Sequence, residues 1–206
     1  MKDFSVVMAL ADFIPVILFA VAAVKLQRDL YFKMTKGAFA LFSTGTMDVV
    51  FTGVAKALYK LLYAANICDF EALNNLYFPV ISIGFLLSGL GLIGMLTHKQ
   101  VENTAMCVVP PVLFKGTSIM VSFMILGLAM ICYCLGVLAY KLKRPSIIAL
   151  LVINFVCSLC MGYLASKDFD RAYWNWIAEG INIIGQGAFL MAAIELRKAG
   201  LSKLKI

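Results

Sequence analysis

Four amide and carboxyl side chains recur along the last apolar stretch of the chain at helical spacing. Taken at positions i, i+4, i+7 and i+11, they are Asn175, Glu179, Asn182 and Gln186. This spacing places all four on one face of a helix. Lipid does not solvate such groups, so we expect that face to look into the protein. Two interpretations stay open: hydrogen bonds that join helices, or the lining of a binding site or aqueous pathway.

Two aspartates lie deep within the first two apolar stretches. At 1.5 Å per residue, Asp12 lies about 12 Å along the first predicted helix and Asp48 about 16 Å along the second. Helices joined by a short loop are usually neighbours, so we expect the two carboxyl groups to share one site. Such a pair would hold a proton or a cation. The alternative is that each accepts a hydrogen bond from a nearby hydroxyl group, such as Ser43, Thr44 or Thr46.

The remaining candidate is Asn154, about 15 Å into a predicted helix that begins near Pro145. No Lys or Arg falls near the midplane, and we expect Lys56 to reach toward the outer interface. The sequence therefore predicts a net acidic interior that favours a proton, a metal ion or an organic cation over an anion. The candidate solute or ion site comprises Asp12, Asp48, Asn154, Glu179, Asn182 and Gln186.

The elements that position these residues are predicted membrane helices. Hydrophobic residues make up 63% of the 206 and charged residues only 14%, whereas a soluble domain carries about 25% charged residues. Each of six apolar segments approaches the roughly 20 residues that cross a bilayer: 4–24, 37–63, 75–96, 117–140, 146–165 and 173–195. We predict an all-α, polytopic transmembrane helix bundle, formed by residues 1–206 as a single membrane domain.

The first apolar segment resembles a secretory signal in part, because within it a small-x-small sequence, Ala20-Val21-Ala22, follows an apolar stretch. Asp12 and Pro15 interrupt the stretch, and Lys2 is offset by Asp3. A signal peptide has an uninterrupted apolar region and a clearly positive start. We therefore interpret residues 4–24 as a retained span.

The connection at residues 99–116 leaves two topologies open. With six crossings, the two faces of the membrane carry 8 and 10 positive side chains; with a short seventh crossing at 99–114, they carry 12 and 6. The positive-inside rule favours seven crossings in the cell membrane, with the N-terminus outside and the C-terminus in the cytoplasm. A sixteen-residue helix spans only about 24 Å, so this crossing would be short.

A faint internal repeat accompanies the seven-span topology. Residues 20–28 resemble residues 136–144, and each segment precedes an apolar helix, an acidic loop and a Gly-rich helix. This pattern predicts two three-helix halves, 1–98 and 117–206, joined by the crossing at 99–116, a 3+1+3 plan of a kind found among transporters. Chance resemblance between apolar helices is the alternative.

No motif for covalent chemistry is visible. The chain has a single histidine, His98, and lacks a G-x-S-x-G sequence and a P-loop. Cys157 and Cys160 form a C-x-x-C pair inside an apolar helix, where cysteine usually serves as a small apolar residue. The net charge of +7 is spread between apolar runs, which does not fit nucleic-acid binding. We expect no catalytic residue, no metal site and no cofactor.

Together these features predict a membrane carrier for a small polar or cationic solute. The first alternative is a membrane receptor or a substrate-capture subunit of a larger complex. The second is an intramembrane enzyme that acts on a lipid, with Asp12 and Asp48 as acid and base. The expected partners are the lipid bilayer and the solute, and either a homo-oligomer or a partner subunit is compatible with the small size.

Overall fold

The chain folds as a bundle of helices in a computed structural model that describes residues 5–97, 117–164 and 172–204. All regular structure in these ranges is helical. The helices are α1 (Val6–Ala11), α2 (Phe13–Leu30), α3 (Lys36–Ala64), α4 (Glu71–Asn75), α5 (Tyr77–Leu96), α6 (Thr117–Lys141), α7 (Pro145–Leu164) and α8 (Ala172–Lys198), with two 3₁₀ turns, η1 (Tyr31–Lys33) and η2 (Leu201–Lys203).

Six helical stretches of the described chain are long and apolar enough to cross a bilayer. The first joins α1, α2 and η1, the third joins α4 and α5, and the others are α3, most of α6, α7 and most of α8. Their outer surface carries large apolar side chains, for example Ile17 on α2, Phe51 on α3 and Val152 on α7. An apolar outer surface is what lipid requires. The prediction of a multi-pass membrane helix bundle is confirmed.

Two of the spans are interrupted close to the same end of the bundle. The first breaks at Asp12, between α1 and α2, and the third breaks at Leu76, between α4 and α5. In each case a proline, Pro15 or Pro79, follows three residues later. Proline has no N–H to donate to the carbonyl group four residues back, which weakens the helix at that turn. The break positions the Asp12 carboxyl group at a helix junction.

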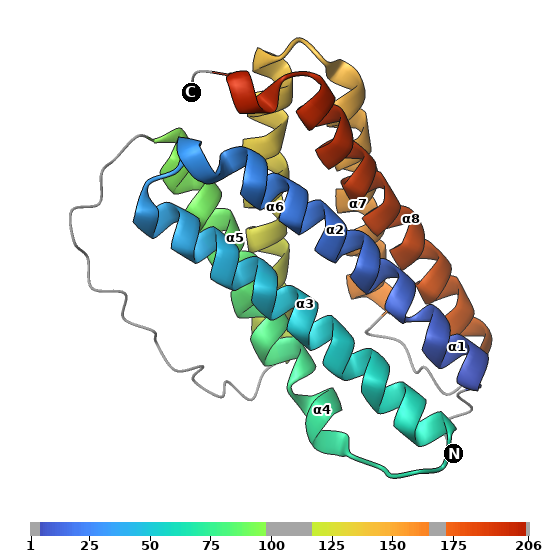
Figure 1. The fold of residues 1–206 in the computed structure, drawn as a ribbon. Coiled ribbons are helices and arrows are strands. Elements are labelled where there is room, and N and C mark those ends of the chain that lie inside the picture. Colours follow the sequence, from blue (N-terminus) through green and yellow to red (C-terminus); the bar gives the residue numbers. More distant parts are fainter. Residues whose placement is uncertain (1–4, 98–116, 165–171, 205–206) are drawn as a thin grey trace.

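The six spans form a closed ring in chain order. Each of α2, α3, α5, α6, α7 and α8 packs against the next, and α8 closes the ring on α2. The start of α1 and the end of α8 lie at opposite ends of this bundle (Figure 1). We call these the N-terminal end and the C-terminal end of the bundle.

Contacts between helices fix their directions. Residues 38–42 of α3 lie against Gly91 of α5, and Val49 lies against Gly84, so these two helices are antiparallel. In contrast, Phe85 lies against Gly127 and Gly89 against Met130, so α5 and α6 run in the same direction. The end of α5 and the start of α6 therefore lie at opposite ends of the bundle.

The predicted seventh crossing at 99–114 lies outside the described residues, so the number of crossings stays a prediction. The parallel direction of α5 and α6 is compatible with it, because the chain must return to the N-terminal end before α6 begins. The 3+1+3 repeat also stays a prediction. The helices of each half nevertheless alternate in the same sense, α2, α3 and α5 in one and α6, α7 and α8 in the other.

Small residues allow the closest approach of helices. A methyl group at Gly45 of α3 would overlap the backbone of Gly84 and Ser88 on α5, and one at Gly127 of α6 would overlap the backbone of Phe85. Close contact of this kind is the main source of association between membrane helices, which gain nothing from the hydrophobic effect within lipid. The α3–α5–α6 seam is therefore the tightest part of the described bundle.

Candidate functional site

A cavity of about 420 Å³ lies inside the ring and is lined by residues of all six spans. Its lining comes from the start of α2, α5, α6 and α8 and from the end of α3 and α7. All of these helix ends belong to the N-terminal end of the bundle. Along α8 the lining extends from Asn175 to Gln186, eleven residues that rise about 16 Å. The cavity thus occupies roughly one half of the bundle.

An aromatic cluster forms the floor of the cavity. Phe19 of α2 stacks on Phe189 of α8 with ring centroids 5.6 Å apart, and its ring meets Phe85 of α5 edge-on at 6.0 Å. Beyond this cluster the interior is filled by buried apolar side chains, including Leu26, Leu92 and Leu196. We call the half beyond Phe19, Phe85 and Phe189 the packed half and the other the cavity half.

The polar face of the last span borders the cavity, as its spacing predicts. The lining residues from α8 include all four members of that face, Asn175, Glu179, Asn182 and Gln186. Glu179 is only 6% exposed, and the Gln186 side-chain oxygen is buried without a hydrogen-bond partner in the described chain. Of the two interpretations, the lining of a polar space is the one that this geometry fits.

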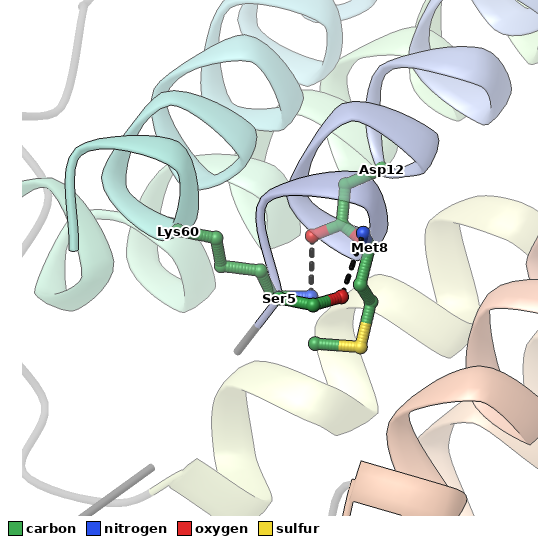
Figure 2. Close-up of polar contacts among 4 residues, drawn as sticks. All are labelled: Ser5, Met8, Asp12 and Lys60. Atoms are coloured by element: carbon green, nitrogen blue, oxygen red, sulfur yellow. Dashed lines mark hydrogen bonds and ion pairs between the residues drawn. The ribbon is translucent and has the colours of Figure 1, made fainter. Parts of the chain in front are cut away.

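Asp12 forms an ion pair with Lys60 across the α2–α3 interface. Figure 2 shows Lys60 reaching from α3 to Asp12 at the junction of α1 and α2. At the other end of α1, Ser5 Oγ caps the helix by accepting a hydrogen bond from the Met8 N–H at 3.2 Å. Asp12 is 8% exposed and Lys60 16% exposed, so the pair is largely withdrawn from solvent. Removing one partner of such a pair would leave a charge without compensation.

A second lysine of α3 also faces the cavity. The Lys56 ammonium group lies 3.7 Å from the centroid of the Tyr77 ring on α5, a cation–π contact. The cavity lining thus contains two lysines, Lys56 and Lys60, and two acids, Asp12 and Glu179. The expectation of a net acidic interior without lysine is wrong, because both lysine side chains turn inward from the end of α3 instead of reaching the interface.

Asp48 is separated from Asp12. It lies twelve residues before Lys60 on the same helix, a rise of about 18 Å, and its Cβ packs beside Gly84 at the α3–α5 seam. Asp48 is not among the cavity-lining residues. The carboxyl group that does approach Asp12 belongs to Glu179, which lies within hydrogen-bonding reach of it. The structure therefore does not bring Asp12 and Asp48 together as an acid–base pair or a shared site.

Asn154 joins helices. Its Nδ2 donates to the Gly185 carbonyl of α8 at 3.0 Å, while Cys132 Sγ of α6 lies 3.9 Å from its Oδ1. The side chain is 1% exposed and does not line the cavity. Asn154 thus has the bonding of an interhelical contact within the bundle.

Sequence reasoning missed Lys60 as the partner of Asp12, although a signal exists. Gly53 of α3 packs against Val16 of α2, and Lys60 follows Gly53 by seven residues on the same helix face. Asp12 precedes Val16 by four residues and so also lies on the facing side. In antiparallel neighbours this register brings a long lysine side chain to the aspartate. Predicting this ion pair from the sequence requires knowing that Val16 and Gly53 are in contact.

Comparison of the chain with protein-family models, with curated proteins and with solved structures finds no match. The fold and the cavity therefore define only a class: a multi-pass membrane helix bundle with a polar, charge-balanced space in one half. Within the described ranges, no group of three or more His, Cys, Asp or Glu side chains forms a metal-binding cluster. What the arrangement offers chemically is hydrogen bonding and paired charges.

Proposed function

We propose that the chain is a carrier that moves a small polar solute across the membrane through the cavity. One observation carries the proposal: a space lined by all six spans reaches about halfway along the bundle and ends at an apolar floor. A carrier exposes its binding site to one side of the membrane at a time. A cavity of about 420 Å³ falls within the usual size range of small-molecule sites.

The proposed solute is polar, without the preference for a cation that a net acidic interior suggested. Two ammonium and two carboxyl groups line the space, together with the amide groups of Asn182 and Gln186. Amide groups and paired opposite charges can accept and donate hydrogen bonds to neutral or zwitterionic molecules. We assign binding to Lys56, Glu179, Asn182 and Gln186, and a positioning role to the Asp12–Lys60 pair.

The proposed orientation places the cavity on the outer face of the cell membrane. Described positive side chains gather at the C-terminal end of the bundle: Lys25, Arg28, Lys33, Lys36, Lys141, Lys143, Arg144, Arg197, Lys198 and Lys203. At the N-terminal end the two described lysines, Lys56 and Lys60, turn into the cavity. The positive-inside rule favours the cytoplasm for the C-terminal end. Seven crossings, with the N-terminus outside, are part of this proposal.

The test begins with binding, because the solute is unidentified. Purified protein is screened by thermal unfolding against sets of small neutral, zwitterionic, cationic and anionic solutes, since a ligand that binds only the folded state raises Tm. The best stabiliser is then used in uptake assays with proteoliposomes. We expect Asn182→Leu, which replaces a cavity-lining amide group with an apolar side chain, to abolish both the Tm shift and uptake. Asp48→Asn, outside the cavity, should preserve both.

A substrate-capture subunit is the second candidate function. The observation that favours it is the filled interior of the packed half. A cavity closed on one side can bind a solute without passing it on. A solute that raises Tm through Asn182 but is never taken up by proteoliposomes would support capture and contradict the carrier. Co-purification of a second subunit that restores uptake would confirm that reading.

A further inference from the structure

Two carboxyl groups lie side by side at the cavity wall. Asp12 and Glu179 are each more than nine-tenths buried, and each has one oxygen, Oδ1 and Oε1 respectively, that is buried without a hydrogen-bond donor in the described chain. Glu179 lies within hydrogen-bonding reach of Asp12. An ionised carboxylate only accepts hydrogen bonds. Two carboxyl groups this close can hold one proton or one cation between them.

The side chains that face the two carboxyl groups decide whether a metal ion or a proton lies between them. From α3, Lys60 pairs with Asp12, and Lys56 and Tyr59 line the same cavity; from α5, Tyr77 lies under Lys56. The lining residues of α6 are apolar, and those of α7 contribute the Ser158 hydroxyl group. Two carboxyl groups offer few ligands for a metal ion, which would also be repelled by two ammonium groups. A proton needs only two oxygens.

We propose that Glu179 carries one exchangeable proton, shared through a hydrogen bond with the Asp12 carboxylate, and that this pair couples solute movement to a proton gradient. The coupling half of this proposal rests on the proposed carrier function; the shared proton does not. On release, the O–H bond breaks and the proton passes to cavity water. The two carboxylates that remain are balanced by the charges of Lys56 and Lys60. Proton carriage by buried carboxyl groups is a common use of acids at membrane depth.

Infrared difference spectroscopy tests the shared proton without any solute. Reconstituted wild-type protein is titrated from acidic to alkaline buffer in H₂O and in D₂O. We expect a carbonyl-stretching band of a protonated carboxyl group that disappears with rising pH and shifts in D₂O. The band should be lost in Glu179→Gln and altered in Asp12→Asn, while Asp48→Asn retains it. Absence of any such titrating band in the wild type would overturn the proposal, and this result does not depend on whether a variant folds.

Proteoliposome uptake then separates the two levels of the proposal. With the stabilising solute found by the Tm screen, we expect an inward proton gradient to raise uptake at least severalfold in the wild type and in the control Asp48→Asn. Equal uptake by the wild type with and without the proton gradient would refute coupling but not the proposed carrier function. A titrating infrared band together with no uptake of any solute would refute the carrier function but support the shared proton.

Discussion

The cavity half and the packed half are built from the same helices but by opposite means. On α8, Glu179 and Asn182 line an open space, whereas Ala192, Ala193 and Leu196 are fully enclosed further along. On α5, Tyr77 borders the cavity, while further along the helix Gly and Ser residues pack against the backbone of α3. Polar side chains from several helices line a shared space at one end, and small residues bring α3 and α5 into backbone contact toward the other.

The difference shows how an open polar space is maintained inside a membrane protein. Small residues in the packed half allow backbone contact, and dispersion forces between closely packed helices then hold the bundle together. Because that half fixes the helix positions, the cavity half need not be filled. The Asp12–Lys60 ion pair joins α2 and α3 within this half. Four predictions test this division, in order of decreasing effect.

Water access should differ completely between the two halves. In a background with the six native cysteines replaced by alanine, we expect a membrane-impermeant maleimide to label Asn182→Cys from the N-terminal side. Ala193→Cys, eleven residues further on the same face of α8, should remain unlabelled because Ala193 is 1% exposed. Mass spectrometry of the labelled protein measures both. Equal labelling at the two positions would contradict the claim that water enters only the cavity half.

Widening the seam of the packed half should prevent folding. Gly45→Leu would drive a side chain into the backbone of Gly84 and Ser88, and neither helix can yield without separating from the other. We expect little or no monodisperse protein in size-exclusion chromatography. Gly180→Leu is the matched control, because nothing lies within 4 Å of an added Cβ there. Normal recovery of Gly45→Leu would show that the seam is not what holds the helices.

Breaking the ion pair of the cavity half should cost about 3 kcal/mol of unfolding free energy, since it leaves a largely buried charge without compensation. Lys60→Met is therefore expected to be much less stable than the wild type in chemical denaturation in detergent. The double variant Asp12→Asn/Lys60→Met should recover most of the loss. Additive effects of the two substitutions would indicate that the residues do not interact.

Removing the Asn154 hydrogen bond should have the smallest effect. Asn154→Leu keeps the branched shape of the side chain but loses the hydrogen bond to the Gly185 carbonyl. Such an interhelical hydrogen bond contributes about 0.6 kcal/mol on average in a membrane protein. We expect a small decrease in Tm and unchanged solute binding, as the residue does not line the cavity. A large loss of solute binding with normal Tm would make Asn154 part of the site.

Much of the fold and one wall of the site could be predicted from the sequence. The spans follow from length and hydropathy, and the α8 face follows from the helical period, because both are properties of a single segment. The partner of Asp12 could not be predicted in this way. The expected Asp12–Asp48 site assumed that equal depth implies proximity, yet Asp48 packs toward α5 while Asp12 lies beside α3 and α8. The position of a residue along its helix gives its depth in the membrane, but the rotation of the helix about its axis decides which neighbouring helix the side chain faces.

The sequence by itself determined that this chain spans the membrane as a helical bundle, and that one face of its last helix is too polar for lipid. Only the tertiary structure decided that Lys56 and Lys60 turn inward, that Glu179 rather than Asp48 approaches Asp12, and that Asn154 bonds to α8 outside the cavity. The reason is physical. Local periodicity fixes what a helix presents on each face, whereas the order, direction and rotation of neighbouring helices are set by close packing between segments far apart in the chain.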